Sequence, residues 1–243
     1  MIASSMLIMP ETQCPHNDPR LKDRDPSSLL AHRRPEDNQF SFFARPWLIR
    51  AKLSADRQDW FEALIYLWVS FNAWLGLAVE DRTYSENDSY LWKAAGQDPL
   101  FKQRFSLILE PSSEYSQLVD QFHALWPIFK ARALADEGIP PWGAWGANEP
   151  RHQYRAEVFA HKIDSRDFSP RCFLDHQESR DDLQSIDPRR IPLDWEHTLA
   201  AIYMVRCNLF HGGKSFRSDK DRDFVSQSYT ILSAVWWGAV RDA

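Results

Sequence analysis

Residues 59–80 read DWFEALIYLWVSFNAWLGLAVE, and this stretch decides the fold class. Apolar side chains occupy nearly every helical face through its middle. A helix that is apolar all round is covered by protein on several sides. We therefore expect a central core helix over about 54–80, with Ser54 as its N-cap and residues 55–58 as its first turn. Asn72 is expected to be a satisfied buried amide that joins this helix to a neighbour.

The same stretch does not predict a membrane span. Its uncharged part runs from 63 to 79, which is shorter than the about 20 apolar residues that cross a bilayer. The first 13 residues have no basic region and only a short apolar run, unlike a signal peptide. We expect a cytoplasmic protein with no membrane partner.

Composition around this helix favours packed helices and a reducing compartment. The 243 residues include 11 Trp and 15 Phe but only 8 Gly, and 44% are hydrophobic, which allows an aromatic-rich core. The three cysteines, Cys14, Cys172 and Cys207, are widely spaced, so we expect neither a disulfide framework nor a metal site. A net charge of −5 argues against coating nucleic acid, yet leaves room for a small basic pocket on one phosphate.

Hydrophobic periodicity predicts more helices on both sides of an irregular segment. They are expected at 88–96, 99–109, 112–133 (capped by Ser112 or Ser113), 191–211 and 218–240. The fold class is therefore all-α, a helical bundle.

Two regions are expected to lie outside the regular bundle. Residues 1–38 combine many prolines with charges and predict an extended N-terminal arm. Residues 138–190 begin with a Pro-Trp-Gly run and predict an irregular insert. We thus expect one helical domain over 39–243, interrupted by this insert.

The most informative short segment is Arg206-Cys207-Asn208-Leu209-Phe210-His211-Gly212-Gly213-Lys214. Gly212-Gly213 is expected to end a helix just after His211, where the helix dipole favours a charged imidazole. The basic neighbours Arg206 and Lys214 act in the opposite direction, so the pKa of His211 is expected to stay near neutrality. Arg206 and His211 differ by about 140° around an ideal helix, so one phosphate reaches both only through a long arginine, a frayed end or a second chain.

This Arg-x4-His segment before Gly-Gly-Lys, together with Phe61–Glu62 through Leu75–Gly76, resembles the HEPN superfamily and its bacterial defence-associated members. The resemblance covers about 54–80 and 191–240. It implies a HEPN-like helical bundle, a homodimer through the Arg206–His211 face, and metal-independent endoribonuclease activity without a cofactor.

The resemblance further implies a role for each residue of the segment. Arg206 would bind the scissile phosphate and His211 would move protons as the 2′-OH attacks, leaving a 2′,3′-cyclic phosphate. Asn208 and Lys214 would bind substrate, with Asn208 orienting phosphate or His211. RNA is the expected partner, and a toxin or antiviral defence effector with an antitoxin or sensor partner is the expected setting.

One position departs from a branch of that family. In toxins silenced by a partner nucleotidyltransferase, a tyrosine stands two residues after the histidine, whereas Gly213 stands here. Silencing by tyrosine modification at that position is therefore not expected.

The residues also allow a different class of function. Arg206 could pair with a carboxylate such as Asp194 or Glu196, and His211 could simply cap a helix. The chain would then be a non-catalytic helical module that binds RNA or a protein. A sensor subunit whose cleavage is released by a partner shares the site and stays open as well.

Overall fold

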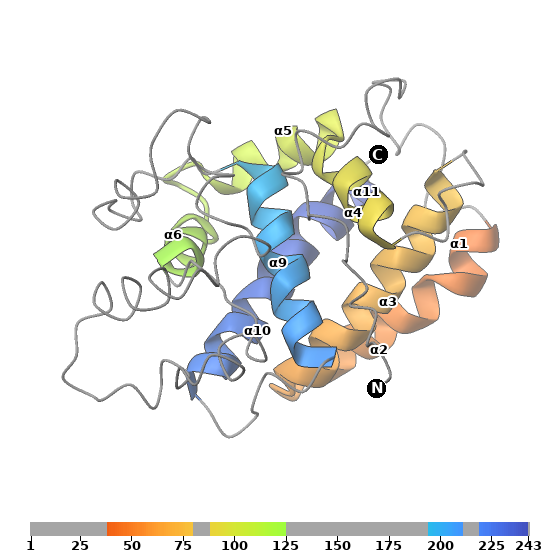
Figure 1. Cartoon of the computed structure of the whole chain (residues 1–243), viewed down its shortest axis with the longest axis horizontal. Coiled ribbons are helices and arrows are strands. Elements are labelled where there is room, and N and C mark those ends of the chain that lie inside the picture. The colour runs from red at the N-terminus through yellow and green to blue at the C-terminus, as the bar shows by residue number, and fades with distance from the viewer. Residues whose placement is uncertain (1–37, 80–87, 125–193, 211–218, 243) are drawn as a thin grey trace, which may run out of the picture.

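The computed structural model describes residues 38–79, 88–124, 194–210 and 219–242, and every regular element in these ranges is a helix (Figure 1). The all-α prediction is confirmed for this part of the chain. The expected arm at 1–38, except for its last residue, and the insert at 138–190 lie outside the described residues.

The expected core helix is two helices rather than one. α2 covers Arg45–Asp56 and α3 covers Trp60–Ala78, so the prediction of a start near Ser54 was wrong. Gln58 turns the chain between them with a φ of 61°, a left-handed conformation that ends a helix. The N-cap of α3 is Asp59, whose carboxylate accepts a hydrogen bond from the backbone N–H of Glu62 at 3.3 Å.

Ser54 has another role inside α2. It is buried, and its hydroxyl donates to the carboxylate of Glu62 at 2.7 Å. Tyr66 donates to the other oxygen of the same carboxylate at 3.0 Å. These bonds lower the pKa of Glu62, with the Ser54 bond as the largest cause. A serine that reads as a cap in sequence is therefore a link between two antiparallel helices.

α3 is the central helix, as its composition predicts. Its buried side chains include Leu64, Leu67, Trp68, Phe71 and Trp74. α3 is also long and apolar enough to cross a membrane by length and composition alone, but half of its most apolar window is buried in the bundle. The helix is thus accounted for as the core of this fold.

The helices after α3 follow the predicted ranges with shifts at their ends. α4 covers Asp88–Gly96 and α5 covers Pro99–Ile108, with Asp98 as the N-cap of α5. α6 covers Ser116–Ala124, so it begins later than the expected 112, and residues after 124 lie outside the described part. Ser113 lies before α6 and does not cap it directly. Its hydroxyl accepts a hydrogen bond from the backbone N–H of Tyr115.

The C-terminal half contributes two long helices. α9 covers Trp195–Phe210, and Asp194 caps it by accepting the N–H of His197 at 2.8 Å. α10 (Asp219–Leu232), the π-helical turn η8 (Ser233–Trp237) and α11 (Gly238–Asp242) follow one another without a break. The sequence predicted one regular helix over 218–240 and did not indicate the π turn.

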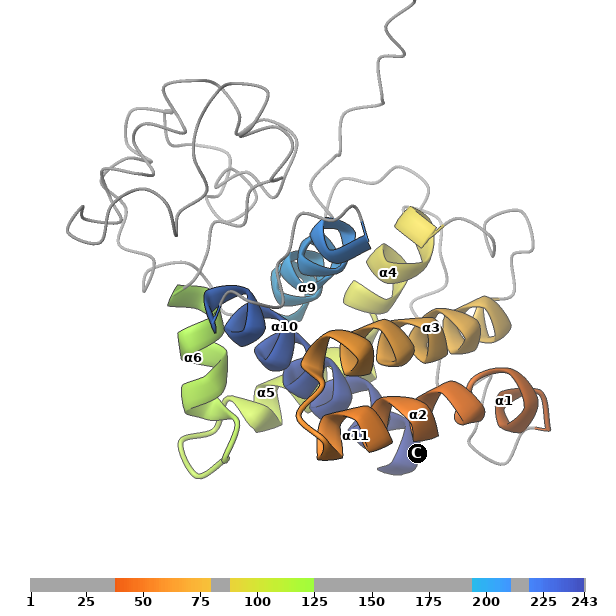
Figure 2. The same cartoon turned by 90° about the horizontal axis from the view of Figure 1, so that it is seen from below.

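These helices stack in layers around α3. Figure 2 shows α2 on one side of α3 and α4 with α9 on the other, while α10 crosses the bundle. α1 (Asn38–Phe43) precedes α2. Neither of these two helices was expected from the sequence.

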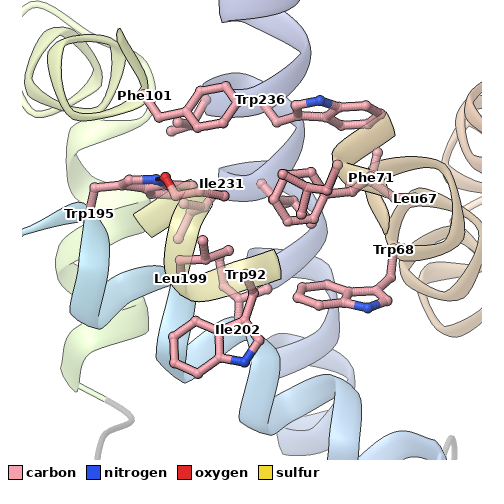
Figure 3. Close-up of a cluster of buried hydrophobic side chains, with 14 of the residues drawn as sticks. Leu67, Trp68, Phe71, Trp92, Phe101, Trp195, Leu199, Ile202, Ile231 and Trp236 are labelled. Carbon is pink, nitrogen blue, oxygen red and sulfur yellow. Dashed lines mark hydrogen bonds between the residues drawn. The ribbon is translucent and has the colours of Figure 1, made fainter. Parts of the chain in front are cut away.

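Aromatic rings fill the space between the layers (Figure 3). Phe71 meets Trp236 edge to face with centroids 5.5 Å apart, and Trp74 meets Phe101 in the same way at 5.7 Å. Trp195 of α9 closes the cluster, since its indole N–H donates to the carbonyl of Ala95 at 3.0 Å. Side chains of α3, α5, α9 and η8 thus share one core, which fixes the position of α9.

Candidate functional site

The described part of the predicted site is the last turn of α9. This helix is buried along most of its length, through residues such as Leu199, Ile202 and Val205. Arg206 follows Val205, and 21% of the Arg206 side chain is exposed to solvent. The helix therefore holds Arg206 at the border between the core and solvent.

A carboxylate from another helix holds the guanidinium of Arg206. Nη1 of Arg206 lies 3.3 Å from Oδ2 of Asp88, the first residue of α4. The other oxygen of Asp88 accepts a hydrogen bond from Nδ2 of Asn72 at 2.6 Å. Asn72, Asp88 and Arg206 thus form a polar chain across α3, α4 and α9, which we call the Arg206 network.

This network decides two expectations from the sequence. Asn72 does join helices, although its Oδ1 is buried and has no hydrogen-bond partner among the described residues. Arg206 does pair with a carboxylate, but with neither Asp194 nor Glu196. Asp194 bonds to His197, and Glu196 pairs with Lys102.

Three aromatic rings surround the guanidinium. Its central carbon lies 4.5 Å from the ring of Phe210, 5.6 Å from Trp68 and 5.8 Å from Tyr203. Cation–π contacts of this kind stabilise a guanidinium that is only partly hydrated. The rings and Asp88 together restrict the orientation of Arg206.

The described residues occupy only part of the hydrogen-bonding capacity of Arg206. A guanidinium carries five N–H donors. Nη1 is its one nitrogen with a partner among the described residues, Asp88 and the sulfur of Cys207 at 3.9 Å. Nε is buried without a partner in that part of the chain. Within the described residues, Arg206 is thus held in place but not fully hydrogen-bonded.

Two other groups beside Arg206, the Tyr203 hydroxyl and the Cys207 thiol, have raised pKa values and stay uncharged at neutral pH. Burial is the main cause that raises the pKa of the Tyr203 hydroxyl well above its usual value, and neighbouring Cys207 and Asp88 add to it. Burial also raises the pKa of the Cys207 thiol. Neither group therefore supplies a ready anion for nucleophilic or metal chemistry.

Asn208 faces the interior of the bundle. It keeps only 5% of its exposure and has further contacts there. The substrate-binding role expected for Asn208 stays a prediction, and it requires RNA to reach a buried amide. Its position suits the alternative role of orienting neighbouring groups.

His211 and Lys214, the other two predicted site residues, lie outside the described residues. The structure therefore brings together Arg206 with Asp88 and Asn72, and leaves the predicted Arg206–His211 pairing as a prediction. Among the residues described, no group of three His, Cys, Asp or Glu side chains could hold a metal ion.

A separate groove of about 950 Å³ lies on the α1–α2 side of the bundle. Its walls combine the rings of Phe40, Trp60 and Trp237 with Arg45 and Lys52. Phe40 and Trp237 are stacked with centroids 6.3 Å apart, which joins α1 to the π turn η8. None of the residues of the Arg206 network lines this groove.

Sequence reasoning missed Asp88 as a member of the site. The signal available was a carboxylate at a predicted helix start, which is usually a response to the helix dipole. Only the packing of α4 against α9 places that carboxylate beside Arg206. No protein-family model, no curated protein and no solved structure matches this chain.

Proposed function

We propose that the chain is a metal-independent endoribonuclease of the HEPN type that acts as a homodimer. The observation that supports it is the state of Arg206. Asp88 and three rings orient this arginine, the described residues leave some of its N–H donors unoccupied, and it lies in the last described turn of the helix that the motif predicts. Such an arginine can accept a phosphate with little further ordering.

In the proposed reaction, His211 takes the proton from a ribose 2′-OH. The 2′ oxygen attacks phosphorus, and the bond from phosphorus to the 5′ oxygen breaks as that oxygen takes a proton from water. His211 then returns its proton to the solvent. Arg206 stabilises the charge that builds on the phosphate oxygens. The products are a 2′,3′-cyclic phosphate and a 5′-OH end. The reaction needs no metal because RNA carries its own nucleophile.

Asp88 has a defined part in this proposal. Its carboxylate lies close enough to Arg206 to compete with a phosphate, yet it also fixes the direction in which the guanidinium points. RNA would share Arg206 with Asp88 through the donors that Asp88 leaves free. A toxin or antiviral defence effector is the biological setting that the resemblance implies.

The test is cleavage of mixed RNA by the purified protein in excess EDTA. Replacing a general base lowers rates by about 10²–10⁴-fold, so His211→Ala should lose cleavage to that extent. Arg206→Lys keeps the charge but not the planar fork, and we expect a loss of about tenfold or more. Arg45→Ala, an exposed arginine on the other side of α3, is the matched control and should cut like the parent.

The outcome is read from the ends of the products. Cyclic-phosphate ends in the parent and their loss in His211→Ala support the proposal. Equal cleavage by the parent and His211→Ala would show that the proposed site is not the catalyst.

One observation favours a second candidate, a non-catalytic helical module that binds RNA or a protein. The Arg206 side chain is largely enclosed and already paired with Asp88, as a purely structural arginine is. Failure of the parent to cleave in EDTA, with RNA still bound and folding intact, would favour this module.

A further inference from the structure

The α1–α2 side of the molecule has an unusual surface. Eight large hydrophobic side chains are exposed in the described part of the chain, and five of them belong to these two helices: Phe42, Phe43, Trp47, Ile49 and Leu53. Phe42 is the most open, with 74% of its surface exposed. Exposed apolar residues gathered in this way mark an interaction surface.

Periodicity places two of these side chains in a stripe along α2. At about 100° per residue, Ile49 and Leu53 lie about 40° apart on the helix. Both are more than half exposed, at 52% and 56%. Ala51 and Ser54, which point to the opposite side by the same count, are fully buried against α3. The stripe therefore lies away from the packed side of the helix, with Ile49 at the edge of the groove that it helps to line.

Basic side chains border the stripe on both sides. Arg45 and Lys52 lie on the side of Ile49, and Arg50 lies on the side of Leu53. All three residues are exposed. Arg45 and Arg50 form no salt bridge with another described residue, whereas Lys52 pairs with Asp56 at 3.0 Å.

The charge of this segment is opposite to that of the chain. Residues 38–57 contain four cations, Arg45, Arg50, Lys52 and Arg57, and one anion, Asp56, which gives a net charge of +3. The whole chain has a net charge of −5. A basic segment on an acidic protein is complementary to a negatively charged surface.

From these features we propose that α1 and α2 dock on an anionic lipid surface. We call Phe42, Phe43, Ile49 and Leu53, with Arg45 and Arg50, the docking face. A helix that lies in a membrane interface inserts an apolar stripe, and its flanking cations reach lipid phosphates on both sides. Figure 2 shows α1 and α2 at the outer edge of the helical bundle, as such docking requires.

Cations lie on both sides of the apolar stripe, and this arrangement favours a lipid surface over a bound peptide. A peptide in the neighbouring groove would meet the charges of one wall, while a lipid surface offers phosphates all round an inserted helix. The sequence led to the expectation of no membrane partner because it predicts no membrane-spanning segment. Peripheral docking needs no such segment, so this proposal revises that expectation. It is independent of the proposed ribonuclease.

The test is co-sedimentation of the full chain with vesicles. One set contains phosphatidylcholine alone, and the other contains phosphatidylcholine mixed with phosphatidylglycerol. The parent should bind the anionic vesicles, stay in solution with the neutral ones, and dissociate as salt is raised. Arg45→Gln/Arg50→Gln should weaken binding by about thirtyfold, since each cation near an anionic surface contributes about fivefold.

Two further variants separate insertion from charge alone. Ile49→Ser/Leu53→Ser should weaken binding by about tenfold or more, because it removes the apolar stripe. Leu100→Ser/Leu107→Ser replaces exposed leucines of α5, at 38% and 46% exposure, and should bind like the parent. Circular dichroism confirms that each variant is folded.

Either of two results would overturn the proposal. One is a parent protein that stays in solution with anionic vesicles. If Ile49→Ser/Leu53→Ser then also turns a dimer into a monomer, the docking face belongs to a contact with a second copy of the chain. The other is undiminished vesicle binding by both docking-face variants.

Discussion

The arginines on the two sides of α3 are held in opposite ways. Arg206 lies among three rings with Asp88 beside it, and its side chain is 21% exposed. Arg45 and Arg50 are exposed and form no salt bridge with a described residue. The difference shows that charge alone does not identify a site. A cation held by its neighbours, such as Arg206, presents its donors in one orientation, while an exposed cation meets a partner in many orientations.

The largest expected effect is on stability, from removing the enclosed arginine. Arg206→Ala should lower the free energy of unfolding by about 2–3 kcal/mol, because it leaves a gap among the rings and removes the cation from Asp88. Arg45→Ala should change it by less than about 0.5 kcal/mol, as exposed substitutions do. Urea unfolding of both variants measures the difference. Equal changes in the free energy of unfolding would show that Arg206 and Arg45 are not held differently by the fold.

A smaller difference in stability is expected at alkaline pH, between the side of α3 with Arg206 and the side with the groove. Burial raises the pKa of Tyr203, beside Arg206, and raises that of Tyr229, beside the groove, to a lesser extent. For a raised pKa, the stability is fully present below the unfolded value of about 10 and is lost as pH rises above it.

Phenylalanine variants of the two tyrosines measure this effect. Tyr203→Phe should remove more of the alkaline loss of stability than Tyr229→Phe. The measurement is the free energy of unfolding between about pH 9 and about pH 11. A larger effect of Tyr229→Phe would contradict the burial that the structure assigns to Tyr203.

The smallest effect is expected from the ion pair of α2 that lies beside the docking face. Lys52 and Asp56 form an ion pair with side chains 73% and 57% exposed. Lys52→Ala should change the free energy of unfolding by less than about 0.5 kcal/mol, since water and salt screen such a pair. Urea unfolding at low and high salt checks this. A clear, salt-dependent loss of stability in Lys52→Ala would contradict this and show that the Lys52–Asp56 pair stabilises α2.

Part of this fold follows directly from the sequence. The all-helical class, the core position of α3 and the ranges of α4, α5 and α9 follow from hydrophobic periodicity, because burial of one side of a helix leaves a regular spacing. The start of α3 was misplaced because Ser54 and Asp59 both suit an N-cap, and the left-handed Gln58 between them leaves no mark in composition. α1 and α2 were missed because their outward side is apolar as well, which obscures the pattern.

The candidate site divides in the same way. The sequence by itself determined that a helix carries Arg206, since the apolar residues before it predict that helix, whereas the predicted end at Gly212-Gly213 lies outside the described residues. Only the tertiary structure decided that Asp88 and Asn72 meet Arg206 and that Asn208 turns inward. These contacts join helices far apart in the chain, and their geometry depends on how aromatic rings from the other helices pack around α3. No local pattern carries that information.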